Sequence, residues 1–91
     1  MNDFAQHCVN QVLRFTFCDN WSQLSEERKT QFAFNLGAVT MFLSLKKEDS
    51  FDQMVLLQQG KLTTHEFREK MKVLFVQYGL KYIPEFAEKA F

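Results

Sequence analysis

The chain has 91 residues, of which 46% are apolar and 24% are charged, and eleven Lys and Arg residues balance eleven Asp and Glu residues. This length suits one domain, and the apolar content excludes a wholly disordered chain. A formal net charge of zero argues against nucleic acid or an acidic membrane as the partner, because both attract proteins with a cationic surplus.

Eleven phenylalanines are the most unusual feature of the composition. A domain of this size buries only about 60–65% of the surface that its unfolded chain exposes. Because each ring carries a large apolar area, we expect part of the aromatic surface to be covered by a partner.

The two cysteines, Cys8 and Cys18, are too few for a disulfide-stabilised secreted scaffold. On one helix they would lie about 15 Å apart, which is too far for a disulfide. The first residues lack the basic and apolar regions of a secretory signal, and the longest apolar stretch, residues 32–45, is shorter than the roughly 20 residues of a membrane span. We expect a cytoplasmic protein with reduced thiols and no contact with a membrane.

Helical periodicity predicts a first helix from residue 3 to about residue 18, although the alternation at residues 13–18 also fits a strand. A second helix is predicted over residues 25–46, with Ser25 as its N-cap and two acidic residues in its first turn. We expect this helix to lie at the centre of the bundle, because large apolar residues occur on two of its faces. Phe32, Leu36, Val39 and Leu43 form one face, and Phe34, Met41 and Leu45 form the other.

Capping signals mark the remaining helices. Ser50 and Gln53 predict a capping box at the start of a third helix, which ends at Gly60. Thr63 and Glu66 predict a second box at the start of a fourth helix, which Gly79 ends. Pro84 suits the first turn of a short fifth helix. The expected fold is an all-α single domain over residues 1–91, a small bundle of four or five helices.

No sequence motif indicates catalysis or a bound cofactor. Neither His7 nor His65 has a nucleophile in a recognisable context, and their spacing from Cys8 and Cys18 does not match a zinc site. The segment from Gly60 to Phe67 partly matches the end of an EF-hand loop, but the preceding ligand positions carry no carboxylate. We therefore expect a non-enzymatic protein without metal or cofactor.

Two functional interpretations remain from the sequence. The first is binding to another protein or to a second copy, as a small inhibitor, an immunity-type protein or a regulatory subunit. Its candidate contact residues are aromatic and apolar: Phe34, Met41, Leu45, Tyr82, Phe86 and Phe91. The alternative is a helix-turn-helix DNA-binding regulator, in which Ala33 and Gly37 take the small and turn positions and a reading helix begins near Thr40.

Overall fold

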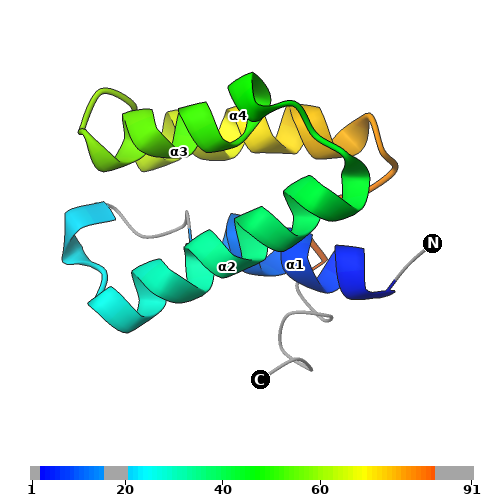
Figure 1. Cartoon of the computed structure of the whole chain (residues 1–91), viewed down its shortest axis with the longest axis horizontal. Helices are drawn as coiled ribbons and strands as arrows, with labels where there is room; N and C mark the ends of the chain where they lie inside the picture. Colours follow the sequence, from blue (N-terminus) through cyan, green and yellow to red (C-terminus); the bar gives the residue numbers. More distant parts are fainter. Residues whose placement is uncertain (1–2, 16–20, 84–91) are drawn as a thin grey trace.

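The computed structural model describes residues 3–15 and 21–83. This part of the chain is helical, as the sequence predicts, and forms a small all-α bundle (Figure 1). Short 3-10 turns, η1 and η2, separate some of the helices. The elements in chain order are α1 (Asp3–Phe15), η1 (Trp21–Gln23), α2 (Glu26–Leu43), η2 (Lys47–Asp49), α3 (Phe51–Gln58) and α4 (Thr64–Val76).

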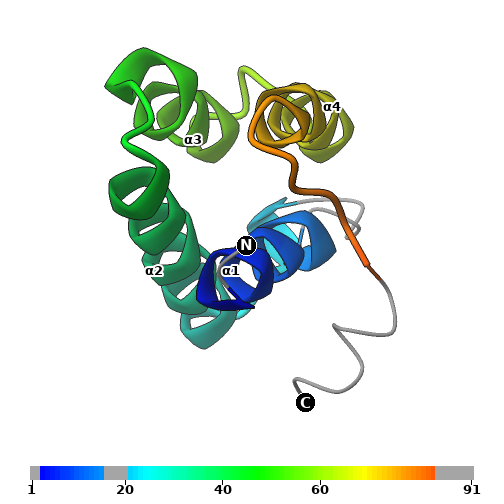
Figure 2. The ribbon, with the colours of Figure 1, turned by 90° about the vertical axis from the view of Figure 1, so that its right-hand side faces the viewer.

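The helices surround one core. α1 and α2 run antiparallel and make the most extensive contact of any two elements, and α3 and α4 lie together across the core from them (Figure 1). Viewed end-on, α2 lies at one side of the molecule between α1 and α3 (Figure 2). The predicted fifth helix falls on residues 84–91, which are outside the described residues.

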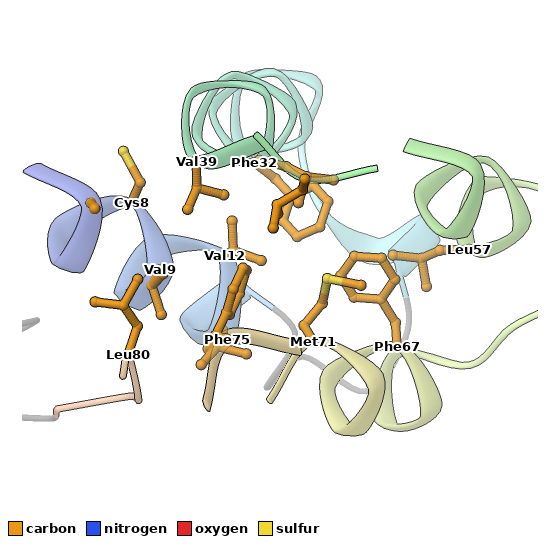
Figure 3. Packing of buried hydrophobic residues seen from close by; sticks show 14 of the residues in the cluster. Cys8, Val9, Val12, Phe32, Val39, Leu57, Phe67, Met71, Phe75 and Leu80 are labelled. Carbon is orange, nitrogen blue, oxygen red and sulfur yellow. The ribbon is translucent and has the colours of Figure 1, made fainter. Parts of the chain in front are cut away.

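Aromatic side chains join three elements at the centre of the core. The ring of Phe32 on α2 lies 4.9 Å from that of Trp21 on η1 and 5.6 Å from that of Phe67 on α4, between ring centroids. Phe32 points from α2 toward Phe67 and Met71 (Figure 3). Aliphatic residues of α1 and α2, among them Val9, Val12 and Val39, fill the other side of the core (Figure 3).

The predicted N-cap of α2 is confirmed, but the helix ends three residues before the predicted end. The hydroxyl of Ser25 accepts a hydrogen bond from the backbone N–H of Arg28 at 3.2 Å. At the other end, Ser44 takes a left-handed backbone conformation with φ of 54°, and Leu45 N–H donates to the Thr40 carbonyl at 2.9 Å. This Schellman-type closure turns the chain away from the helix axis.

Replacing Ser44 with glycine is expected to raise the free energy of unfolding by about 0.5–1 kcal/mol, because a side chain disfavours positive φ. Gly60 and Gly79 close α3 and α4 with the same bonding pattern, at φ of 75° and 74°. Urea unfolding followed by circular dichroism measures the effect. Gly60→Ser is the reverse substitution at an equivalent position and serves as the control. It is expected to lower the free energy of unfolding, because a Cβ at residue 60 meets no atom within 4 Å and only backbone strain is added. Equal stability of Ser44→Gly and wild type would contradict the argument.

The start of α3 departs from the predicted capping box. Ser50 makes no side-chain cap, and its hydroxyl donates to the Lys46 carbonyl at 3.2 Å. Gln53 Nε2 donates to the Glu48 carbonyl at 3.1 Å instead of reaching back to Ser50. The reason is that η2 leads directly into α3, so Ser50 does not take the extended conformation that an N-cap requires.

The capping box at the start of α4 is confirmed. The backbone N–H of Thr63 donates to the Glu66 carboxylate, and the Glu66 N–H donates to the Thr63 hydroxyl, each at 3.0 Å. Leu62, just before the cap, and Phe67, in the first turns of α4, are both buried in the core. The hydrogen bond from the Thr63 backbone is the main cause that holds the pKa of Glu66 below its ordinary value of 4.5.

This lowered pKa predicts an acid-dependent contribution to stability. Because the pKa of Glu66 is lower in the folded state, its charge stabilises the fold fully above about pH 4.5, and the contribution is lost as the pH falls through the folded-state pKa. Glu66→Gln is therefore expected to lower the Tm at neutral pH and to approach wild type in acid. Thermal unfolding across this pH range measures it, with Glu69→Gln as a control outside the box. A Tm difference independent of pH would contradict the prediction.

Candidate protein-binding surface

α2 is apolar on two opposite faces, and only one of them is covered. Phe32, Leu36 and Val39 face the core and are fully buried. Phe34 and Met41 are 69% and 81% exposed. At 100° per residue these two side chains lie within about 20° of each other around the helix, on the side opposite to the core. An amphipathic surface helix carries one apolar stripe that faces the core, so this second, uncovered apolar face of α2 is unusual.

Two further aromatic rings extend this exposed face onto α1. The rings of Phe42 on α2 and Phe4 on α1 lie 5.9 Å apart between centroids, and both side chains are about half exposed. The outer apolar surface is defined here as Phe34, Met41, Phe42 and Phe4. From their exposed fractions it offers on the order of 500 Å² of apolar area. This is comparable with the largest apolar patch on a typical monomer, which is often functional.

The structure places the predicted contact residues in different environments. Phe34 and Met41 lie together on the outer apolar surface, as the helical spacing predicts. Leu45 is only 8% exposed and belongs to the core, so the prediction that it shares their face is wrong. The cause is the left-handed turn at Ser44, which ends α2 and directs Leu45 inward. Tyr82 is half-buried against the core. Phe86 and Phe91 lie outside the described residues.

The sequence interpretation missed Phe4 and Phe42. Helical spacing puts Phe4 on the same stripe as Cys8 and Val12, which are fully buried, whereas Phe4 is about half exposed. Phe4 lies in the first turn of α1, where its ring meets Phe42 near the end of α2, at the edge of the helix pair. The signal that would have revealed this contact is the antiparallel pairing of α1 with α2, which brings the start of one helix beside the end of the other.

A second exposed region lies on α4. Val73 and Val76 are 64% and 63% exposed. Val73 also borders an open groove of about 480 Å³ between the η2–α3 segment and α4. Carboxylates, a lysine and amides supply most of the remaining lining, and Gln53 Oε1 is buried there without a hydrogen-bond partner among the described residues. This mixture of charges selects no particular ligand.

The structure also locates the candidate reactive groups. Burial raises the pKa of the Cys8 thiol, so this cysteine stays protonated at neutral pH and is a poor nucleophile. In the described part of the chain, no group of three or more His, Cys, Asp and Glu side chains is placed to hold a metal ion. Among the helices of residues 3–15 and 21–83, none has the length and apolar character to cross a membrane.

The helix-turn-helix arrangement considered from the sequence is not formed. α2 continues without interruption through Ala33, Gly37 and Thr40, so no turn separates a reading helix from a preceding one. A Cβ at Gly37 would lie 3.8 Å from the ring of Phe51 on α3, which is an ordinary van der Waals contact. Comparison of the chain with protein-family models, with curated proteins and with solved structures finds no match.

Proposed function

We propose that this chain is a non-enzymatic cytoplasmic protein that acts by binding another protein through the outer apolar surface. The observation that carries the proposal is the exposure of Phe34 and Met41 side by side on α2. A small inhibitor, an immunity-type protein and a regulatory subunit all work in this way, and so does a protein that binds a second copy of itself.

The exposed area is large enough to matter energetically. Covering on the order of 500 Å² at about 25 cal/mol per Å² contributes on the order of 10 kcal/mol. This is similar to the translational and rotational cost of association, so the apolar contribution roughly offsets that cost before polar contacts are added. Aromatic side chains and methionine are also enriched at the centres of protein interfaces.

Affinity capture with matched baits tests the proposal. The wild-type chain is compared with Phe34→Gln/Met41→Gln, which makes the outer apolar surface polar with good helix formers. The control is Val73→Gln/Val76→Gln, which removes a similarly exposed apolar pair from α4. We expect at least one protein, including an added untagged copy of the chain, to bind the wild type and the α4 variant but not the α2 variant. Capture that is identical for all three baits would refute the proposal.

A separate measurement, of affinity for DNA, tests the alternative function. Affinity for duplex DNA that falls steeply with salt would indicate contacts to phosphates, which the proposed surface does not supply. We expect no retention on heparin at physiological ionic strength, since the chain has no net charge.

A further inference from the structure

Five residues on the outer side of α2 follow the spacing of a helix-pairing seam. Glu27, Gln31, Phe34, Ala38 and Met41 recur at alternating intervals of four and three residues. This 3.5-residue repeat keeps one stripe of a helix facing a second helix along its length. By helical spacing all five lie on the side of α2 away from the buried Phe32 and Leu36. Ala38 is half-buried there, because it also packs against the core. The surface is therefore shaped for another helix.

α2 is complementary to itself when a second copy lies antiparallel to it. Along the seam, the large Phe34 alternates with the small Ala38. In a two-fold antiparallel pair centred between these two residues, Phe34 of each copy packs over Ala38 of the other. In the same register, Met41 of each copy lies opposite Gln31 of the other. Large side chains thus meet small or flexible ones, and two large rings do not compete for one position.

The area of the outer apolar surface also suits a pair of copies. Two outer apolar surfaces together bury on the order of 1,000 Å². This meets the lower bound for a specific interface, so the pair is expected to be weak, with a Kd on the order of 10 µM.

We infer that the occupant of the outer apolar surface is a second copy of this chain, bound through an antiparallel α2–α2 contact. This inference rests on the proposed function and names its partner. It differs from binding to an unrelated protein because it predicts association in the purified chain alone.

Sedimentation equilibrium of the purified full chain is the first test. The weight-average mass of the wild type is expected to rise from monomer toward dimer between about 1 and 500 µM, the range that brackets the expected Kd. Phe34→Gln/Met41→Gln is expected to stay monomeric, and Val73→Gln/Val76→Gln to behave as wild type. A wild type that is monomeric throughout, or an α2 variant that still dimerises, would overturn the inference. The proposed function would still stand if affinity capture found another protein that needs Phe34 and Met41.

Thiol protection tests whether a second copy or the chain's own residues cover the seam on α2. Gln31→Cys, made with Cys18→Ser, places an accessible thiol on the seam and keeps both Phe34 and Met41; Cys8 is buried. Its reaction with a disulfide reagent is expected to be fast in dilute protein and to slow at least fivefold in concentrated protein. Lys72→Cys on α4 is the exposed control and stays fast. Slow reaction at every concentration would mean that the chain covers its own seam, and fast reaction at every concentration would mean that nothing covers it.

Disulfide trapping then tests the register. Gln31→Cys and Met41→Cys chains, each with Cys18→Ser, are mixed and oxidised. In the antiparallel pair these two thiols lie opposite each other, whereas two Gln31→Cys thiols lie about 15 Å apart, beyond disulfide reach. We expect mixed disulfides to exceed both like-with-like species. A predominance of like-with-like species would overturn the antiparallel arrangement.

Discussion

Replacing Phe32 with alanine is expected to lower the free energy of unfolding by about 3–5 kcal/mol. Phe32 is fully buried, and its ring contacts both Trp21 and Phe67, so the substitution removes the link between η1, α2 and α4. A small domain has only about 5–15 kcal/mol of stability in total, so this substitution removes a large share of it. Urea unfolding followed by circular dichroism measures it without depending on the fluorescence of Trp21, which the substitution itself changes.

Phe34→Ala is the matched control for this experiment. It deletes the same side chain from the same helix two positions later, where 69% of the side chain is exposed. In dilute protein we expect a change of no more than about 0.5 kcal/mol, since exposed positions lose little burial and alanine favours helix. Similar losses from Phe32→Ala and Phe34→Ala would contradict the assignment of the inner and outer faces of α2.

Features that depend on a few neighbouring residues were predictable from the sequence. The capping box of Thr63 and Glu66 and the N-cap of Ser25 satisfy orphan N–H groups of their own helix, so their signals are local. Gly60 and Gly79 were identified as helix ends for the same reason, because each supplies a positive φ.

Predictions failed where a local signal competed with the path of the chain. Ser44 has no preference for the left-handed region, so nothing in the sequence marked it as the end of α2, and Leu45 was assigned to the wrong face. Ser50 matched a capping box by composition, but the preceding turn η2 fixed its backbone in another conformation. In both cases the path of the backbone next to the helix end overrode the propensity of one residue.

The candidate surface was only partly predictable. The spacing of Phe34 and Met41 placed them on one face of α2, yet it could not tell which apolar face would meet the core. That choice depends on how α1 and α3 pack beside α2. Phe4 and Phe42 lie on different helices, so their contact follows from the pairing of α1 with α2 and has no signature in either segment.

A pair of buried amides ties the last described residues to α1. Asn10 is fully buried, and its Nδ2 donates to the Ile83 carbonyl at 2.9 Å while its Oδ1 accepts from the Ile83 N–H at 3.1 Å. One turn earlier, Gln6 Nε2 donates to the Lys81 carbonyl at 2.6 Å and to Asn10 Oδ1 at 2.9 Å. The sequence interpretation did not include these contacts, because they join residues more than seventy positions apart in the chain.

Asn10→Leu is expected to lower the free energy of unfolding by about 2–3 kcal/mol, because it leaves both backbone groups of Ile83 and one bond of Gln6 without their partner. Gln11→Met is the matched control on the same helix: Gln11 is also buried, but its Nε2 has no hydrogen-bond partner among the described residues, so removing it is expected to be neutral or stabilising. Urea unfolding gives both values, and faster hydrogen exchange of the Ile83 amide in Asn10→Leu locates the loss. Equal effects of the two substitutions would show that the bonds to Ile83 contribute nothing beyond burial, and that the segment 81–83 is held to α1 by apolar packing alone.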